Sequence, residues 1–407
     1  MFLILRQELS TDRIMDILWI NQRNVARECG GIESITLTLA SEFSKAGIIS
    51  HLAYYEDNDF ETKENVFVTR THISEICKLQ QYAEIINKGI DYVLIQQVPK
   101  DIWCIRTLLD RLNSSAKIIY IQHDYLSRNL SDSVKNYVIF NCRYCTGINK
   151  LKAFIKLITW PLYWSNAFKN LKKNYKVAFN QSDAIVILSE KFLQGGQALI
   201  GRENMSKVVA IGNCLTLPYT YDCKRLREKK KTVLLVSRLC EDRKRITLAL
   251  EIWRRVNVIK EMADWQFVIV GDGPNRAIYE KIVKIKSIPN IVFKGRQANL
   301  KPYYWDSSIF LMTSDNEGWG LTLTESLQSG VIPIAFHSFE SISDIITNHK
   351  DGVIVDDGDI DGYVSALLDL MQDEGKRLLM AENAIAKSQN FAPSLVAEKW
   401  YNLFKII

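Results

Sequence analysis

The stretch Thr313–Phe336, TSDNEGWGLTLTESLQSGVIPIAF, decides how the rest of the chain is interpreted. It follows the apolar run Ile309–Met312, which is typical of a buried strand, and it places Gly318 and Gly320 just before a helical pattern that begins near Leu321. Glycines let the backbone approach a ligand closely, and a helix start offers unpaired N–H groups to a diphosphate. The stretch therefore predicts a phosphate-binding turn between a strand and a helix.

Two glutamates, Glu317 and Glu325, frame this turn with seven residues between them. Glu325 falls about one turn into the expected helix, where its carboxylate can accept hydrogen bonds from two ribose hydroxyls. Glu317 precedes the helix and lies nearer the expected position of a sugar attached to the phosphate. Isolated glutamates at this spacing are usually solvated surface charges, but here they flank a glycine-rich strand-to-helix turn.

Short apolar, β-branched runs recur along both halves of the chain, and amphipathic stretches of helical length separate them. The runs of the first half span 16–20, 91–96, 117–122, 183–188 and 208–211. The runs of the second half span 233–236, 267–270, 291–293, 309–312, 332–335 and 352–355. Alternating strands and helices predict a doubly wound α/β fold, which binds ligands at the carboxyl ends of parallel strands.

Length and composition exclude several classes of protein. The 407 residues suffice for two domains, and 47% hydrophobic with 24% charged residues are values of a globular chain, not a disordered one. No apolar run reaches the roughly 18 residues of a membrane span, and the chain start lacks a secretory signal. The eight cysteines are scattered along the chain, which favours reduced thiols in the cytosol. Cys142 and Cys145 form a C-x-x-C, but a zinc site would need a second pair of ligands, and none is evident in the sequence.

The central stretch resembles the E-x7-E signature of the family-4 retaining glycosyltransferases, and SGVIPIAF resembles their A-x-G-x-P-V-V-A segment. The resemblance implies the GT-B fold, in which two Rossmann-like domains face each other across a deep cleft. It assigns contact with the donor sugar to Glu317 and contact with the nucleotide ribose to Glu325. It assigns binding of the donor sugar and diphosphate to Gly318, Trp319, Gly320, Leu321 and Thr322.

A second motif, VLLVSRLCEDRKRITLALEIWRRV at 233–256, resembles the G-R-L…K-G motif of this family. Arg238 matches its arginine, and Lys244 matches its lysine if four residues separate it from Leu239; at the shorter spacing the cation is Arg243. Two cations aimed at a departing nucleoside diphosphate would stabilise its growing negative charge. Arg245 stands where the family has glycine, so the conformation of the local turn is left in question. The alternative interpretation of this motif is a basic helix start on the protein surface.

Weaker resemblances complete the expected site. VIVGDGPNR at 268–276 places Gly271 in a tight turn after a strand, and IVFKGRQANLKPYY places Arg296 beside the nucleotide base. In the first half, Gly30 and Gly31 resemble a double-glycine loop that closes over the donor phosphates. His123 follows a strand and is expected near the donor sugar. For both motifs the alternative is a structural role: a plain strand-to-helix turn for the glycine pair, and a structural histidine at a strand end.

The sequence offers no clear nucleophile and no clear metal site. Family members retain the anomeric configuration by a proposed same-face attack, so Glu317 is expected to position the donor. The letters Asp357-Gly358-Asp359 resemble a D-x-D metal motif, but acidic residues before a helix more plausibly cap it. We therefore expect no cofactor and no metal.

The segment 143–176 contains eight lysines and arginines, seven aromatic residues and no acidic residue. Cations with aromatic residues suit an anionic bilayer surface, while a packed helical pair with a solvated basic face is the alternative. Pro161 is expected to divide the segment into two helices. Nucleic acid is not favoured, because the chain shows no nucleic-acid motif.

The expected organisation has five parts. They are a non-core extension at 1–14, an N-terminal Rossmann-like acceptor-binding domain at 15–215, a linker at 216–231, a C-terminal Rossmann-like nucleotide-sugar domain at 232–391, and a helix at 392–407 that packs back toward the N-terminal domain.

The expected activity is metal-independent, retaining transfer of a hexose from a nucleotide-diphosphate sugar, most simply a UDP-sugar. The acceptor would be a glycan or polyprenyl-linked glycan of bacterial surface polysaccharide synthesis, such as capsule or O-antigen. The enzyme would be cytoplasmic, with a peripheral position at the inner membrane face as a further expectation. A GT-B sugar-nucleotide epimerase and a non-catalytic membrane-associated scaffold are the alternatives, and the sequence leaves the oligomeric state open.

Overall fold

The computed structural model describes residues 14–27, 30–58, 65–96, 100–123 and 130–407. The expected extension at 1–14 lies outside the described residues except for Ile14. The chain forms two compact units. Unit 1 takes the described residues of Met1–Ser127, Phe168–Thr216 and Phe391–Ile407, and unit 2 takes those of Arg128–Ala167 and Leu217–Asn390.

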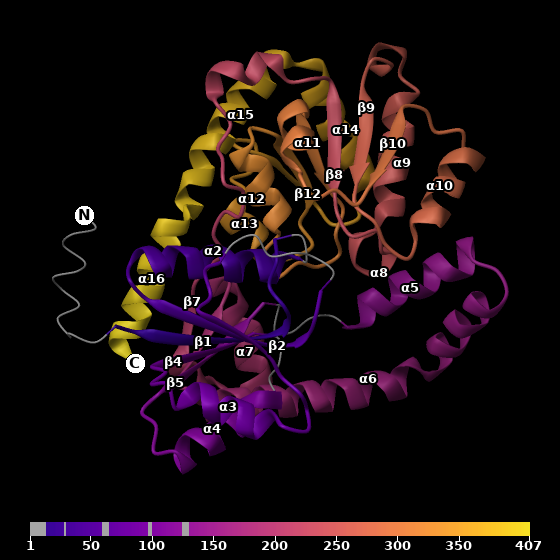
Figure 1. The fold of residues 1–407 in the computed structure, drawn as a ribbon. Helices are drawn as coiled ribbons and strands as arrows, with labels where there is room; N and C mark the ends of the chain where they lie inside the picture. Colours follow the sequence, from indigo (N-terminus) through magenta and orange to yellow (C-terminus); the bar gives the residue numbers. More distant parts are fainter. Residues whose placement is uncertain (1–13, 28–29, 59–64, 97–99, 124–129) are drawn as a thin grey trace. The chain divides into compact units, whose positions relative to one another are not determined.

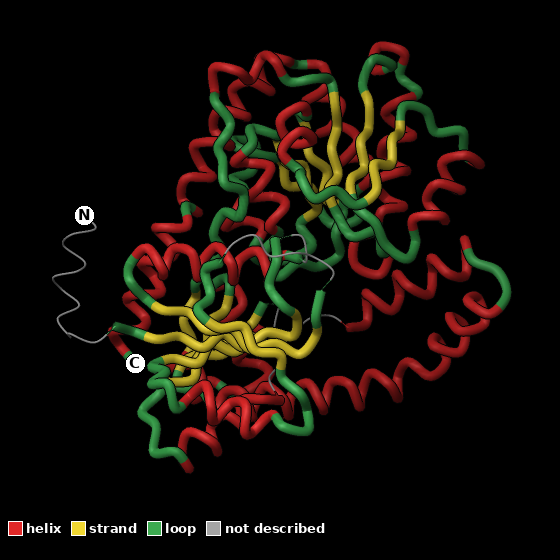
Figure 2. Tube along the Cα trace, in the orientation of Figure 1, coloured by secondary structure: helices red, strands yellow, loops and turns green. Residues whose placement is uncertain are grey.

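Unit 1 contains a seven-stranded parallel sheet in the order β3-β2-β1-β4-β5-β6-β7. Figures 1 and 2 show its strands lying side by side. Its strands are β1 Asp16–Arg23, β2 Ile49–Glu56, β3 Thr69–His72, β4 Tyr92–Gln96, β5 Lys117–Gln122, β6 Ala184–Ile187 and β7 Val208–Ala210. Helices cover a parallel sheet on both faces, so its central strands must be apolar throughout. Accordingly, Ile17, Leu18, Trp19 and Ile20 of β1 are fully buried.

The strands β2 and β3 were not expected from the sequence. β3 reads TRTH and lies at the edge of the sheet, where a strand needs only one neighbour and no continuous apolar run. β2 carries the polar Ser50 and His51 in buried positions. The Ser50 hydroxyl accepts a hydrogen bond from Trp19 at 3.2 Å, and the His51 ring lies 2.9 Å from the Thr69 hydroxyl. Tertiary partners therefore allow polar residues in a strand that an apolar pattern would miss.

Unit 2 contains a six-stranded parallel sheet in the order β10-β9-β8-β11-β12-β13. Its strands are β8 Thr232–Val236, β9 Gln266–Val270, β10 Ile291–Gly295, β11 Ile309–Met312, β12 Ile332–Phe336 and β13 Val353–Val355. All six match apolar runs expected from the sequence. The two sheets confirm the predicted α/β class with two doubly wound halves.

The helices of both units alternate with the strands (Figure 1). They are α2 Gly31–Lys45, α3 Lys78–Ile86, α4 Lys100–Arg111, α5 Leu130–Tyr144, α6 Ile148–Gln181, α7 Leu193–Ile200, α8 Glu241–Lys244, α9 Ile246–Asn257, α10 Arg276–Ile285, α11 Lys301–Asp306, α12 Leu321–Gln328, α13 Ile342–Ile345, α14 Ile360–Gln372, α15 Glu374–Ser388 and α16 Pro393–Ile406.

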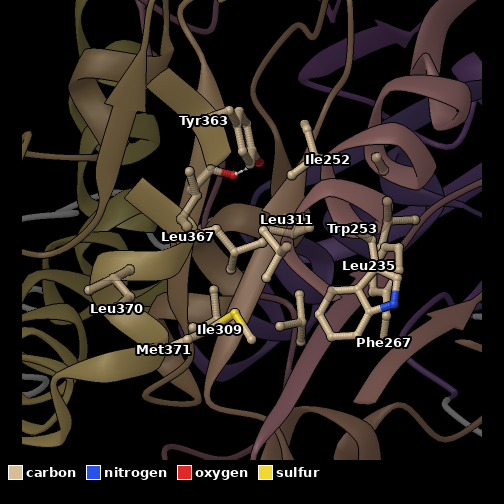
Figure 3. Close-up of a cluster of buried hydrophobic side chains, with 14 of the residues drawn as sticks. Leu235, Ile252, Trp253, Phe267, Ile309, Leu311, Tyr363, Leu367, Leu370 and Met371 are labelled. Carbon is tan, nitrogen blue, oxygen red and sulfur yellow. Dashed lines mark hydrogen bonds between the residues drawn. The ribbon is translucent and has the colours of Figure 1, made fainter. Parts of the chain in front are cut away.

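The core of unit 2 lies between its sheet and the helices α9 and α14 (Figure 3). Trp253 of α9 is fully buried and donates its indole N–H to the carbonyl of Pro289 at 2.9 Å. Tyr363 of α14 is also fully buried (Figure 3), and its hydroxyl donates to the carbonyl of Ile334 in β12. Both polar tips are paired, so these large side chains fill the core without leaving an unpaired donor.

The segment 130–181 differs from expectation in two respects. Pro161 was expected to end a helix, but α6 runs from Ile148 to Gln181 through it. A proline lacks the backbone N–H, so it removes one donor from this 34-residue helix, which nevertheless continues past it. In addition, the described residues 130–167 belong to unit 2, and Phe140 of α5 packs in the core of unit 2 against Tyr279, with ring centroids 5.8 Å apart.

The last helix, α16, packs against α2 in unit 1. Phe43 of α2 lies 5.7 Å from Phe404 and 6.5 Å from Trp400, measured between ring centroids. The hydroxyl of Tyr92 donates to the carbonyl of Phe404 at 2.6 Å. No helix among the described residues is long and apolar enough to cross a membrane.

Candidate functional site

The site in unit 2 is built where β8 and β11 end. The chain after β8 forms the short helix α8, and two hydrogen bonds tie it to the chain after β11. The amide of Asp315 donates to the carbonyl of Arg243 at 2.7 Å, and the Thr313 hydroxyl donates to the carbonyl of Lys244 at 2.9 Å. Neighbouring parallel strands bring both segments to the carboxyl edge of the sheet, where doubly wound folds bind ligands.

These bonds bring two of the predicted residues into direct contact. The ammonium group of Lys244 forms a hydrogen-bonded ion pair with the carboxylate of Glu317. The side chains are 22% and 16% exposed, so the pair can be reached from outside. Lys244, rather than Arg243, therefore takes the position facing Glu317.

Arg245, which follows Lys244, adopts the left-handed conformation, with φ 46° and ψ 46°. Its buried guanidinium donates to the carbonyls of Thr313 and Ser314, both at 2.8 Å, and to the carboxylate of Asp357 at 2.6 Å. An arginine thus occupies a turn that suits glycine, and its side chain fastens α8 to the end of β11.

The start of α8 is anchored by a buried acid. Glu241 accepts hydrogen bonds from the Thr247 hydroxyl, from the Thr247 amide at 3.1 Å and from the Tyr279 hydroxyl at 2.9 Å. Burial raises the pKa of Glu241 to about 7, against the lowering effect of these bonds. This anchor on α9 and α10 was not expected from the sequence.

Arg238 lies on a loop held by a glycine turn. A Cβ added to Gly271 would lie 1.8 Å from the carbonyl oxygen of Ser237, and one added to Gly273 would lie 2.5 Å from that of Leu239. The two loops therefore touch backbone to backbone, which only glycine permits. Arg238 itself is exposed and has no ion-pair partner among the described side chains, so its charge is available to a ligand.

Glu325 lies in α12, which begins after Gly320 in the left-handed conformation with φ 89°. Glu325 is 9% exposed, and the buried Tyr304 donates its hydroxyl to the Glu325 carboxylate at 2.9 Å. Burial and the neighbouring carboxylate hold the pKa of Tyr304 well above its ordinary value, so this hydroxyl remains a donor. Tyr304 was missed from the sequence, because nothing local links α11 to α12.

The residues between the two glutamates form a turn that is partly buried. The carbonyl of Gly318 accepts a hydrogen bond from the Ser341 hydroxyl at 3.1 Å, and Trp319 is 6% exposed. Leu321 and Thr322 form the first turn of α12 and are half-buried. Their backbone N–H groups lack helical partners four residues earlier, as at every helix start.

Arg296 follows Gly295, whose carbonyl accepts a hydrogen bond from the amide of Gly271 at 2.8 Å. The side chain of Arg296 is exposed. The structure thus connects this loop to the turn that supports Arg238.

In unit 1, His123 belongs to a hydrogen-bond network at the ends of β1, β4 and β5. The Nε2 of His123 lies 2.6 Å from the Oε1 of Gln96. The Nε2 of Gln96 donates to the Thr36 hydroxyl at 2.7 Å and to the Oδ1 of Asn21 at 3.2 Å. Because the Gln96 amide nitrogen is used by these acceptors, its oxygen requires a donor, and Nε2 of His123 must carry the proton.

This network defines the chemical state of His123. Burial lowers the pKa of His123 to about 4, so its ring is neutral at pH 7. With the proton on Nε2, the Nδ1 atom of His123 is a hydrogen-bond acceptor. The partner Gln96 was not identified from the sequence, although it ends an expected strand.

Gly30 and Gly31 lie at the start of α2, and both are exposed. A Cβ on Gly30 would lie 2.8 Å from the carboxylate of Glu33. The site residues thus fall into two sets. Unit 1 holds Gly30, Gly31 and His123, and unit 2 holds Arg238, Lys244, Gly271, Arg296, Glu317, Gly318, Trp319, Gly320, Leu321, Thr322 and Glu325.

Asp357 and Asp359, the acidic residues of the D-x-D pattern, have partners within the protein. Asp359 is the N-cap of α14 and accepts a hydrogen bond from the amide of Gly362 at 2.9 Å, while Asp357 pairs with Arg245. Within the described ranges, no group of three or more His, Cys, Asp or Glu side chains could hold a metal ion.

Comparison with known proteins finds a family match in the second half of the chain. Residues 222–387 match the family described as glycosyl transferases group 1. The 2-deoxystreptamine N-acetyl-D-glucosaminyltransferase of Niallia circulans is 28% identical over 243 residues, 55% of this chain and 59% of the relative. The amylovoran biosynthesis glycosyltransferase AmsD of Erwinia amylovora is 28% identical over 205 residues, 49% of this chain and 56% of that protein. The matches thus span little more than half of these relatives.

Solved structures resemble the chain over nearly its whole length. TarM, known from S. aureus, superimposes with a TM-score of 0.73 at 13% identity, covering 97% of this chain and 99% of that chain. HepE of Anabaena, solved in complex with UDP-glucose, also has a TM-score of 0.73, at 15% identity, covering 97% of this chain and 100% of that one. The protein therefore has the GT-B fold. Its residues 222–387 are similar to the family described as glycosyl transferases group 1.

Proposed function

We propose that the protein is a retaining glycosyltransferase that takes a hexose from a nucleotide-diphosphate sugar, with UDP as the nucleotide. The observation that carries the proposal is the contact between Lys244 and Glu317 in the family-matched domain, which also holds the Glu325 carboxylate bonded to Tyr304. The choice of UDP is supported by the related fold of HepE, which was solved with UDP and with UDP-glucose.

Each residue has a defined part in the proposed reaction. Glu325 accepts hydrogen bonds from the ribose, and Glu317 positions the donor sugar. Lys244 exchanges its contact with Glu317 for the diphosphate, and Arg238 adds a second positive charge. His123 accepts a hydrogen bond from a sugar hydroxyl through Nδ1, because its Nε2 is committed to Gln96.

The bond changes need neither a metal nor an enzyme nucleophile. The bond between the anomeric carbon and the phosphate oxygen breaks, and its electron pair leaves with the nucleoside diphosphate. The acceptor hydroxyl bonds to the same face of the anomeric carbon, and its proton passes to the leaving phosphate. The protein contributes orientation and fixed positive charge.

We propose a glycan or polyprenyl-linked glycan of bacterial surface polysaccharide synthesis as the acceptor, with the enzyme working in the cytoplasm. One matched relative acts in amylovoran biosynthesis, and another, from Campylobacter jejuni, extends a glycan on undecaprenol diphosphate and is 29% identical over 176 residues. The proposal covers the class of acceptor, such as capsule or O-antigen precursors.

The first test is thermal stability with UDP-, GDP-, ADP- and dTDP-sugars without added metal. A ligand that binds only the folded protein raises the melting temperature. We expect one nucleotide to raise it, Glu325→Ala to abolish the rise, and Tyr304→Phe to weaken it while the neighbouring Tyr303→Phe does not. The absence of any shift in a folded protein would contradict the proposed donor site.

Turnover provides the second test. Lys244→Ala should lower transfer by at least about a hundredfold, since one lost charge-stabilising contact commonly costs that much in rate. Unchanged turnover would refute the role of Lys244. Conversion of the sugar nucleotide without any acceptor would instead identify an epimerase.

A further inference from the structure

The first part of α6 exposes an unusual number of apolar side chains. The apolar face of α6 comprises Ile148, Leu151, Phe154, Ile155 and Ile158, with Leu157 outside this arc, and each of the six is between 51% and 69% exposed. Ile148, Leu151, Ile155 and Ile158 follow the three- and four-residue spacing that places side chains on one side of a helix. Single exposed apolar residues are ordinary, but a contiguous group of this size marks a binding surface.

The opposite side of this helix is already packed. Ala153 is fully buried, and the ammonium of Lys156 lies 4.4 Å from the ring centroid of Tyr137 in α5. α5 in turn inserts Phe140 into the core of unit 2. The helix therefore packs against the protein through the side of Ala153 and Lys156, and its apolar face is on the solvent-exposed side.

The charges around the face have one sign. Lys150 and Lys152 are exposed within the same turns, and the whole segment 143–176 has eight basic residues and no acidic one. The later part of α6 is different: Lys169, Lys172, Lys173 and Lys176 are exposed, but Tyr175, Ala178 and Phe179 are buried. Among the α6 side chains that the structure describes, apolar exposure and positive charge thus coincide in the first part, 148–158.

We propose that residues 148–158 of α6 dock on an anionic lipid bilayer, with the apolar face in the interface and the lysines among the headgroups. A helix with an apolar face bordered by lysines binds in the plane of such a surface, and anionic lipids add attraction for each cation. A second copy of the chain is a poorer partner, because it would bring another lysine-rich, acid-free segment against the first. The inference rests on the proposed function in one respect: membrane docking would give the enzyme access to a lipid-linked acceptor.

The test measures sedimentation of the full chain with vesicles of phosphatidylcholine and phosphatidylglycerol, and with vesicles of phosphatidylcholine alone. We expect binding to the anionic vesicles, and weakening by added salt, because salt screens the lysines. Ile155→Ser combined with Ile158→Ser should weaken binding by more than about tenfold, since two large apolar side chains no longer enter the interface. Lys150→Gln combined with Lys152→Gln should weaken it less.

The matched control is Val258→Ser combined with Ile285→Ser, which removes two apolar side chains that are 72% and 71% exposed elsewhere in unit 2. This variant should bind vesicles like the wild type. Equal binding by the α6 variant, or no binding of the wild type to anionic vesicles, would overturn the proposal. A wild-type dimer that becomes monomeric in the α6 variant, without vesicle binding, would assign the face to a second copy.

Failure here remains distinguishable from failure of the proposed function. The nucleotide-induced rise in melting temperature depends on the donor site and needs no lipid. The α6 variant should retain that rise whatever the vesicles show.

Discussion

Arg245 shows how one side chain can reverse the preference of its backbone. The left-handed conformation costs an ordinary residue roughly 1–2 kcal/mol, which is why glycine is favoured there. Arg245 offsets this cost because its buried guanidinium bonds to Thr313, Ser314 and Asp357. Hydrogen bonds with a charged partner contribute about 1.5–3 kcal/mol each. The departure from glycine that the sequence left in question is therefore compatible with the turn.

We predict that Arg245→Gly destabilises the protein by about 2 kcal/mol or more, because the lost charged hydrogen bonds outweigh the relieved backbone strain. Urea unfolding measures the change. His349→Gly is the matched control, since His349 also has a positive φ, 60°, but is exposed. That control should change stability by less than about 1 kcal/mol. A stabilised Arg245→Gly protein would show that the guanidinium bonds contribute little.

His123 leads to a prediction about pH. Its pKa is about 6.5 in an unfolded chain and about 4 in the fold. Between these values the unfolded chain binds more protons, so the free energy of unfolding falls as the pH falls. From pH 7 to pH 5 the loss should be about 2 kcal/mol larger in the wild type than in His123→Asn, by the linkage of pKa to stability. Equal losses in urea unfolding would show that His123 is not held neutral.

At the scale of elements, the turns that support the site could be predicted from the sequence because their geometry is local. A strand followed by glycines and a helix predicts its own conformation, and Gly271, Gly273 and Gly320 occupy such turns. The edge strand of the first sheet and the continuity of α6 could not be predicted in this way. The edge strand β3 is polar, and Pro161 lies inside α6 where a local rule ends the helix.

We predict that Gly271→Ala destabilises the protein by about 3 kcal/mol or more, because its Cβ would meet the Ser237 carbonyl and its φ of 131° suits only glycine. Gly358→Ala is the comparison: φ is 83° there, but no atom lies within 4 Å of the added Cβ. That change should cost only about 1–2 kcal/mol, from the backbone alone. Similar unfolding free energies for the two variants would contradict the proposed close packing of the two loops.

At the scale of the whole molecule, the end of the chain completes the first unit. α16 follows all the strands of unit 2 in sequence, yet it packs on α2 of unit 1 with Trp400 and Phe404 buried. The reverse holds for α5, which lies between two strands of unit 1 in sequence but packs in the core of unit 2. Sequence order therefore does not give unit membership.

We predict that Trp400→Ala destabilises unit 1 by about 3–5 kcal/mol through the cavity it leaves. Ile406→Ala in the same helix is the control, because Ile406 is 75% exposed and its truncation should cost less than about 0.5 kcal/mol. Thermal unfolding monitors both. If the Trp400 variant melts like the Ile406 variant, α16 does not contribute to the core of unit 1.

The sequence alone determined the α/β class, the six strands of the second sheet and the glycine turns between strand and helix. These features depend on periodicity and on residues next to one another, which a single chain displays. Only the tertiary structure decided the partners: Tyr304 for Glu325, Gln96 for His123, and the guanidinium bonds that allow Arg245 its turn. Such pairs join different strands and helices, so they depend on which elements become neighbours, and hydrophobic burial sets that arrangement without leaving a local pattern.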